Sequence, residues 1–212
     1  MIGITPRGRK LLFFRPMTTH IPLVLASTSP HRRLLLERLR LPFQSLAPGV
    51  DEAELAGEAP ADRAARLALA KAQAVAAVRP DAIVIGSDQV ASLETGGRIE
   101  VLHKPGTREN CRRQLAALSG HTARFDTALA VAHAGRVIAH GDLTRVRFRA
   151  LDAASIESYL DLEPSFDCAG GFKCEGLGVT LFEWIENRDP TALIGLPLIA
   201  LCAALRQLGV RV

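Results

Sequence analysis

The sequence predicts an α/β protein with a mixed, partly antiparallel, elongated sheet flanked by helices. Residues 23–26 and 82–86 are apolar runs without polar alternation, which is typical of strands buried on both faces. Other segments read as strands joined by short turns at Gly96 and Gly135. Because strand–turn–helix units and hairpins occur in one chain, a mixed sheet is favoured over a purely parallel one.

The composition is that of an ordinary folded domain. The chain has 212 residues, of which 48% are hydrophobic and 23% charged, so it is long enough to bury a full core. The longest apolar stretches, such as residues 196–205, cover about ten residues, whereas a helix that crosses a bilayer needs about 20. We therefore expect no membrane segment.

The net charge of +4 arises in the first 16 residues. They hold four basic residues and no acidic one, which leaves 22 basic and 22 acidic residues in 17–212. A neutral body argues against a protein that binds nucleic-acid phosphates over its whole surface. We predict that residues 1–16 are a disordered or non-native extension and that 17–212 form a single domain with two lobes.

Cysteine spacing gives no sign of a disulfide framework or a zinc motif. The four cysteines form no CxxC pair, and no histidine nearby supplies the spacing of a zinc site. We therefore predict reduced thiols in a cytoplasmic protein. The cysteines are Cys111, Cys168, Cys174 and Cys202.

In the first third of the chain, helix start and stop signals place two helices. Ser29 is a favourable N-cap and Pro30 a favourable first helical residue, and Pro80 ends the second helix. The predicted elements are a strand at 23–26, a helix from Pro30, a strand at 43–46 and a helix over 61–78.

The rest of the sequence, from residue 82 onward, predicts a sheet that is partly built from hairpins. Four glycines within residues 169–178 indicate a loop, and Asp152 is a favourable helix cap. The predicted strands are 82–86, 122–133, 136–140, 143–149 and 179–184, and the predicted helices are 107–118, 152–162 and 197–208.

A first polar cluster lies at the predicted turn between residues 23–26 and the following helix. Ser27, Ser29 and Arg32 combine hydroxyl and guanidinium donors with the N–H groups and partial positive charge of a helix N-terminus. Such donors suit a phosphate group. An ordinary helix cap uses the same residues, so both interpretations stay open.

Carboxylates occur in two further clusters. Asp51 and Glu52 in a Pro/Gly loop suit Mg²⁺, although acidic loop residues are more often simply solvated. Asp88 follows residues 82–86, at the predicted carboxyl end of a buried strand, where open α/β sheets hold ligands. Burial and neighbouring charge can tune such a carboxylate as a general base or metal ligand, and a turn cap is the alternative.

Lysine is rare, with four lysines among the 26 basic residues. Three of them, Lys71, Lys104 and Lys173, lie in candidate functional segments, although a lone lysine in an Ala-rich helix is usually exposed to solvent. Cations, carboxylates and glycines together indicate a polyphosphate ligand. The Walker pattern and the GxGxxG fingerprint are both missing, so neither a P-loop enzyme nor a dinucleotide dehydrogenase is supported.

Seven motifs resemble, in order and spacing, those of the Maf nucleotide pyrophosphatases, once called septum formation inhibitors. The resemblance covers residues 22–209. The motifs are Leu25-Ala26-Ser27-Thr28-Ser29-Pro30-His31-Arg32, Val50-Asp51-Glu52, Ala70-Lys71-Ala72, Gly86-Ser87-Asp88-Gln89, Lys104-Pro105, Ala169-Gly170-Gly171-Phe172 and Gly195-Leu196-Pro197.

The resemblance implies a fold related to the inosine-triphosphate pyrophosphatases, with a central cleft. It also implies hydrolysis of a nucleoside triphosphate to the monophosphate and pyrophosphate with a divalent metal, Mg²⁺, Mn²⁺ or Co²⁺. By position, the resemblance implies Asp88 as proton acceptor, Glu52 and Asp88 at the metal, Ser27, Arg32, Lys71 and Lys104 at the phosphates, and His31, Gln89 and Glu175 in substrate specificity.

Within the family, Gln89 and Glu175 resemble the branch that acts on 7-methyl-GTP, whose base carries a positive charge that a carboxylate or an aromatic ring such as Phe172 would favour. His31, Cys174 and Ala128 stand where tryptophan, serine and glycine are expected. The alternatives are a dTTP/UTP or broad-specificity pyrophosphatase and, in another class, a non-catalytic nucleotide-binding regulator of cell division. A small-molecule nucleotide is the expected partner, and a homodimer is left open.

Overall fold

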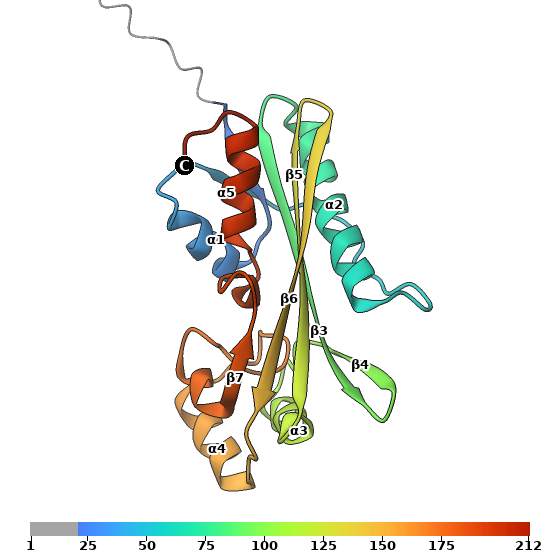
Figure 1. The fold of residues 1–212 in the computed structure, drawn as a ribbon, viewed down its shortest axis with the longest axis vertical. Helices are drawn as coiled ribbons and strands as arrows, with labels where there is room; N and C mark the ends of the chain where they lie inside the picture. Colours follow the sequence, from blue (N-terminus) through green and yellow to red (C-terminus); the bar gives the residue numbers. More distant parts are fainter. Residues whose placement is uncertain (1–20) are drawn as a thin grey trace, which may run out of the picture.

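A single mixed sheet runs through the molecule (Figure 1). The computed structural model describes residues 21–212, so the predicted extension at 1–16 lies outside the described residues. The strands follow the order β2-β1-β3-β5-β6-β7, and β4 pairs with β3. The strands are β1 (Leu23–Ala26), β2 (Gln44–Leu46), β3 (Ile83–Thr95), β4 (Arg98–Leu102), β5 (Thr122–His133), β6 (Arg136–Phe148) and β7 (Phe182–Glu186).

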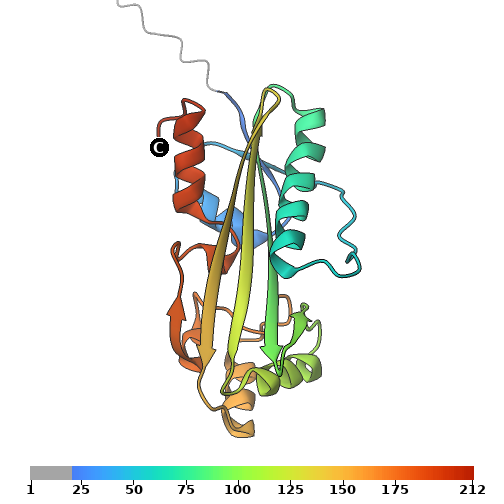
Figure 2. The ribbon, with the colours of Figure 1, turned by 45° about the vertical axis from the view of Figure 1, so that its right-hand side comes forward.

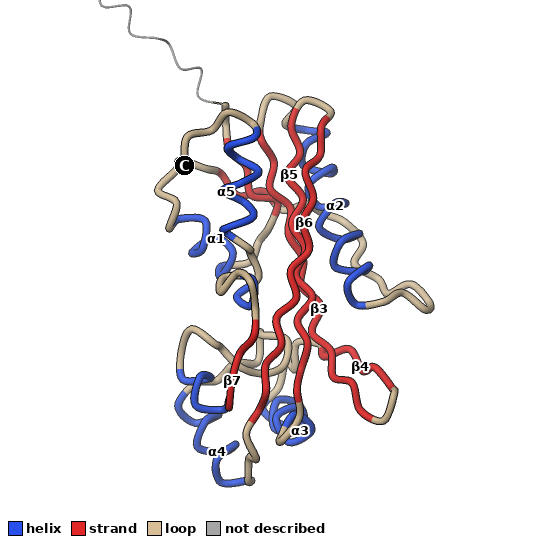
Figure 3. Tube along the Cα trace, viewed as in Figure 1, coloured by secondary structure: helices blue, strands red, loops and turns tan. Residues whose placement is uncertain are grey.

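The sheet changes from parallel to antiparallel at β3. β1 pairs in parallel with β2 and with the start of β3, whereas β3 pairs antiparallel with β4 and β5, and β5–β6 and β6–β7 are also antiparallel. The long strands β3, β5 and β6 connect the two ends of the elongated molecule, as the strand colouring of Figure 3 shows. The predicted mixed α/β architecture is confirmed.

Helices cover both faces at one end of this sheet and gather at its other end. Figure 2 shows α2 and α5 on opposite sides of the long strands, while α3 and α4 lie at the far end. The helices are α1 (Pro30–Glu37), α2 (Pro60–Val78), α3 (Arg108–Leu118), α4 (Ala153–Leu162) and α5 (Leu198–Gln207), with 3₁₀ turns η1 (Leu177–Leu181) and η2 (Ala192–Ile194). Within residues 21–212, none of the helices has the length and apolar character needed to cross a membrane.

The core consists of separate clusters on the two faces and at the far end. On one face, Leu35 of α1 and Leu201 of α5 pack with Leu25 and Ile85 of the sheet. At the far end, a cluster that includes Phe125 collects side chains from α3 and α4. These clusters hold the helices on the sheet. The polar segments between the clusters are therefore not needed for the core and can line a pocket.

Four predicted strands need correction. The predicted strand 82–86 continues through Thr95, because β3 keeps an antiparallel partner in β5 after its parallel pairing with β1 ends. Strands 136–140 and 143–149 are one strand, because Gly141 remains paired with Ala128 of β5. The predicted strand 179–184 begins only at Phe182, after the 3₁₀ turn η1, and pairs with β6 as far as Glu186.

Gly86 of β3 lies directly against the backbone of α2. A Cβ atom added there would lie 2.2 Å from the carbonyl oxygen of Ala68 and 2.7 Å from the amide nitrogen of Ala72, both in α2. Backbone atoms cannot yield as a flexible side chain can. Gly86 therefore sets how near α2 lies to β3.

Gly86→Ala is expected to lower the free energy of unfolding by about 1–3 kcal/mol, because the methyl group pushes α2 off the sheet. Urea denaturation monitored by circular dichroism measures this change. Gly141→Ala is the control, since a Cβ at Gly141 in β6 meets no atom within 4 Å among residues 21–212, its two chain neighbours apart. Equal effects of the two substitutions would contradict the proposed close contact.

Candidate active site

One pocket brings together all nine residues to which the resemblance assigns a catalytic, metal, phosphate or specificity role. It has a volume of about 820 Å³ and lies where β1, β3, α1 and α2 meet the loops. Its lining includes Ser27, His31, Arg32, Glu52, Lys71, Asp88, Gln89, Lys104 and Glu175. Residues from six separate stretches of the chain thus converge on one cavity, as a substrate site requires.

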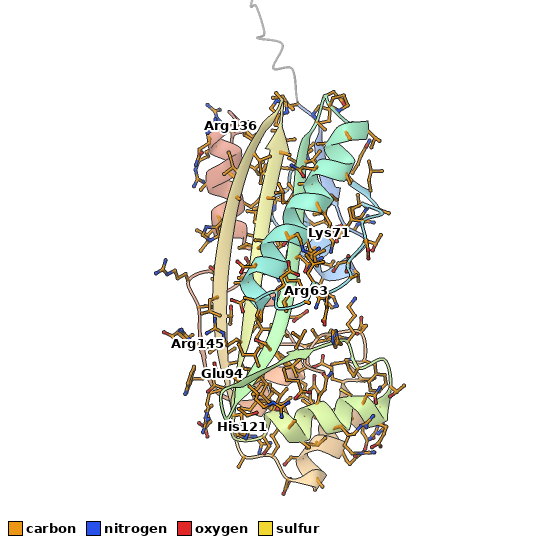
Figure 4. All side chains as sticks on the ribbon, turned by 90° about the vertical axis from the view of Figure 1, so that its right-hand side faces the viewer. Arg63, Lys71, Glu94, His121, Arg136 and Arg145 are labelled. Carbon is orange, nitrogen blue, oxygen red and sulfur yellow. The ribbon has the colours of Figure 1, made fainter. Side chains whose placement is uncertain are left out.

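A buried ion pair between α2 and β3 lies at the centre of the pocket. Lys71 is 4% exposed and Asp88 is 6% exposed. The Lys71 Nζ atom donates to Asp88 Oδ1 at 2.6 Å and lies 2.7 Å from Oε1 of Glu52, on the loop before α2. Figure 4 shows Lys71 on α2 at mid-height of the molecule, with Arg63 near the start of the same helix.

The local fold explains why this pair forms. Lys71 lies three residues after Ala68 in α2, so both are on the helix face turned toward Gly86. Asp88 lies two residues after Gly86 in β3, on the same face of the strand because side chains alternate. The tight approach at Gly86 therefore brings the ammonium group against the carboxylate.

Arg32 joins the same cluster from α1. Its Nε donates to the carbonyl oxygen of Gly195 at 2.9 Å, and its Nη2 lies 4.0 Å from Asp88 Oδ1. The Ser87 hydroxyl donates to the same carbonyl at 2.9 Å. Gly195 has φ 115°, a left-handed conformation that side chains rarely adopt, and this conformation shapes the turn whose carbonyl receives both donors.

The charges in the cluster affect one another's ionisation. Burial lowers the pKa of Arg32, while the negative charges of Asp88 and Glu52 oppose this effect. Burial alone would raise the pKa of Glu52. The hydrogen bond from Lys71, with the charges of Lys71, Arg32 and Lys104, outweighs burial and holds that pKa below its ordinary value. The loop carboxylate therefore stays ionised.

Ser27 and Ser29 serve the helix cap and lie beside the pocket. The Ser29 side chain accepts from the Arg32 amide at 3.4 Å, and the Ser27 hydroxyl accepts from the Ser29 amide at 3.1 Å. Both seryl residues line the pocket. The cap and phosphate interpretations are thus compatible, because a capping hydroxyl keeps its own proton for a ligand.

The predicted specificity residues lie in two places. His31 Nδ1 lies 3.2 Å from Glu175 Oε1, and Glu175 Oε2 accepts from the Cys174 thiol at 3.4 Å. Gln89 makes no such contact with His31 or Glu175. Its amide nitrogen donates to the Thr127 hydroxyl and to the Ala192 carbonyl, so it anchors the η2 turn beside the pocket.

Two residues from the predicted clusters lie outside the pocket lining, and a third lines it in another role. Asp51 is exposed, accepts from the Ala53 amide and does not line the pocket. Lys173 also lies outside the lining, and its Nζ donates to the Pro164 carbonyl. Phe172 lines the pocket but is only 5% exposed, and it packs in T-shaped contacts with Phe125, Phe148 and Phe182, so most of its ring belongs to the core.

Arg63, Asp167 and Cys168 also line the pocket, although nothing in the sequence around them predicts a role there. Arg63 Nη2 donates to the Glu52 carbonyl at 3.1 Å and Nη1 pairs with Glu54, so this arginine holds the loop of Glu52. An arginine in the first turn of a helix gives no sequence signal of this role. Asp167 and Cys168 lie before the glycine-rich loop and approach His31 only through the tertiary fold.

Comparison with known proteins identifies relatives over nearly the whole described chain. Residues 22–208 match the family described as "Maf-like protein". A "7-methyl-GTP pyrophosphatase" of Xanthomonas axonopodis pv. citri (strain 306) is 54% identical over 190 residues, which cover 90% of this chain and 98% of that protein. A protein of the same name from Albidiferax ferrireducens is 48% identical over 192 residues, covering 90% and 94% of the two chains.

Among solved structures, the Ham1 protein of Staphylococcus aureus aligns with a TM-score of 0.41 and 15% identity, covering 60% of this chain and 71% of that chain. Sequence similarity is far stronger to the Maf-like proteins. The family match extends from the start of β1 to the end of α5 and includes the whole pocket. The chain therefore belongs to the Maf-like protein family.

Proposed function

We propose that this protein is a nucleotide pyrophosphatase that hydrolyses 7-methyl-GTP to 7-methyl-GMP and pyrophosphate. The observation that carries the proposal is the buried cluster of Lys71, Asp88, Arg32 and Glu52 inside a pocket large enough for a nucleotide. The name of the Xanthomonas and Albidiferax relatives supports the choice of substrate.

The reaction needs the negative charge of a triphosphate to be neutralised before water can attack. Arg32, Lys71 and Lys104 provide three cations along the pocket. Water attacks the α-phosphorus, a new P–O bond forms, and the bond to the oxygen bridging the α- and β-phosphorus breaks, so pyrophosphate leaves with that oxygen. Positioned cations stabilise the charge that accumulates in such a transition state.

Asp88 is the acid–base group in this proposal. Its carboxylate is held by Lys71 at Oδ1 and approached by Arg32, so its position is set by two cations. A carboxylate in that position accepts a proton from the attacking water or holds the cation that activates the water. Both roles require the negative charge of Asp88.

A divalent cation fits the donor set of Glu52 and Asp88. Carboxylate oxygens are the ligands that Mg²⁺ and Mn²⁺ prefer, and both residues already bind one cationic atom, Lys71 Nζ, through a single oxygen each. When bound, the metal would neutralise phosphate charge and lower the pKa of a coordinated water. Arg63 would keep Glu52 in place through its backbone carbonyl.

In this proposal, His31 and Glu175 recognise the base. Methylation at N7 gives guanine a positive charge, which the Glu175 carboxylate at the pocket wall would favour. The partners of Glu175 among the described residues are the side chains of His31 and Cys174, so it is not a cap for the loop backbone. This leaves the carboxylate suited to a ligand.

The proposal is tested by pyrophosphate release from 7-methyl-GTP, GTP, dTTP and UTP, each with and without Mg²⁺, Mn²⁺ or Co²⁺. We expect metal-dependent release that is highest with 7-methyl-GTP. Preference for dTTP or UTP would favour a pyrimidine-type enzyme. Nucleotide binding without release under any of these conditions would favour a non-catalytic nucleotide-binding protein.

Asp88→Asn is expected to lower kcat by about 10²- to 10⁴-fold, because an amide keeps the shape but cannot accept the proton. Nucleotide binding, measured by calorimetry, should persist, since Arg32, Lys71 and Lys104 remain. Asp51→Asn is the matched control, because Asp51 is the neighbouring loop carboxylate that lies outside the pocket. A loss of less than tenfold in Asp88→Asn, with the control unchanged, would remove Asp88 from the mechanism.

Glu175→Gln is expected to reduce the preference for 7-methyl-GTP over GTP by about 1–3 kcal/mol, the usual range for a hydrogen bond to a charged group. Glutamine keeps an oxygen for His31 and removes only the charge. The ratio of kcat/KM values for the two substrates measures the effect, with the melting temperature as a check on folding. An unchanged ratio would show that another residue recognises the methylated base.

A further inference from the structure

A second cluster of potential ligands lies at the wall of the same pocket. His31, Asp167 and Cys168 each offer one ligand atom, and these three atoms lie within 4.8 Å of one another. His31 Nε2 is 3.8 Å from Asp167 Oδ2 and 3.8 Å from Cys168 Sγ, and Cys168 Sγ is 3.6 Å from Asp167 Oδ1. His31 belongs to α1, and the other two residues come from the loop after α4.

These separations are slightly longer than those between the ligands of a tetrahedral zinc ion. With Zn–N and Zn–O distances of about 2.0 Å and a Zn–S distance of about 2.3 Å, ligand atoms lie roughly 3.3 to 3.6 Å apart. The His31–Cys168 contact needs to shorten by only a few tenths of an ångström to reach this spacing, and the Asp167 carboxylate, which turns one oxygen toward each neighbour, would have to aim a single oxygen at the ion. Imidazole and thiolate groups favour zinc-class ions over Mg²⁺, which prefers oxygen ligands.

The environment of His31 provides an independent observation. Its other ring nitrogen, Nδ1, lies 3.2 Å from Glu175 Oε1. When Nδ1–H donates to this carboxylate, Nε2 is left unprotonated, with its lone pair available to a ligand on the side of Asp167 and Cys168. A carboxylate that orients a histidine in this way is the usual outer partner of a metal-bound imidazole.

We propose that His31, Asp167 and Cys168 bind a zinc-class divalent cation, with Glu175 as the positioning residue for His31. Three protein ligands leave the fourth coordination position to water, on the pocket side. Binding forms a metal–sulfur bond and releases the thiol proton to solvent. The site is distinct from the Glu52 and Asp88 carboxylates, which offer oxygen only.

The location predicts a consequence for turnover, which rests on the proposed function. His31 and Glu175 both line the part of the pocket assigned to the base. When His31 holds a cation and Glu175 positions His31, both side chains are withdrawn from the nucleotide. We therefore expect Zn²⁺ to raise KM for 7-methyl-GTP in the wild-type protein.

The direct test is titration of the full-length, reduced protein with Co²⁺, followed by displacement with Zn²⁺. Cobalt bound to a thiolate gives a charge-transfer absorption band, whereas cobalt on carboxylate oxygens does not. We expect one thiolate-bound Co²⁺ per chain, no such band in Cys168→Ser, and about 100-fold or greater loss of affinity in His31→Ala. Cys202→Ser is the matched control, since Cys202 lies in α5 outside the pocket, and it should retain the band.

Glu175→Gln separates positioning from ligation. It should weaken Co²⁺ binding about 10- to 100-fold while the charge-transfer band persists at saturation. A wild-type protein without the band, or a band that survives in Cys168→Ser, would overturn the metal site. Equal inhibition of wild type and Cys168→Ser by Zn²⁺ would overturn the effect on turnover. The cobalt spectra test the metal site even if the protein hydrolyses no nucleotide. The metal-site proposal and the pyrophosphatase proposal can therefore be refuted independently.

Discussion

The contact between Lys71 and Asp88 is the constraint on which the rest of the pocket depends. A lysine and an aspartate are both almost fully buried here, and removing either partner would leave an uncompensated charge away from water. Their distance of 2.6 Å is possible only because Gly86 lets α2 lie against β3. The packing of a helix on a sheet therefore determines the position of the carboxylate, and Glu52 and Arg32 gather around the pair from a loop and from α1.

Much of this arrangement could be predicted from the sequence. The strand at 23–26, the cap at Ser29 and the long helix that carries Lys71 follow from apolar patterning and stop signals that act over a few residues. Of the three lysines that their scarcity singled out, Lys71 and Lys104 line the pocket, whereas Lys173 lies outside it and donates to the Pro164 carbonyl. Rarity shows that a residue is unusual and says nothing about where its side chain points.

The features that could not be predicted depend on contacts between distant segments. Asp88 is predicted at the end of a strand and lies inside β3, because pairing with β5, and further along with β4, extends that strand. Likewise, cysteine spacing gives no zinc motif, although Cys168 and His31 approach each other from positions 137 residues apart. Spacing rules detect ligands that one turn or helix brings together. A site assembled from α1 and a distant loop has no such spacing to detect.

The pocket thus has two chemically different regions. Around Asp88, three cations and two carboxylates suit phosphate groups and a hard metal ion that coordinates oxygen. Around His31, an imidazole, a thiol and two carboxylates suit a positively charged ligand, whether a methylated purine or a softer metal ion. A single nucleotide would span both regions, with its phosphates at one and its base at the other. Selectivity for a cationic base and susceptibility to a zinc-class ion would then have one physical cause, the negative charge gathered around His31.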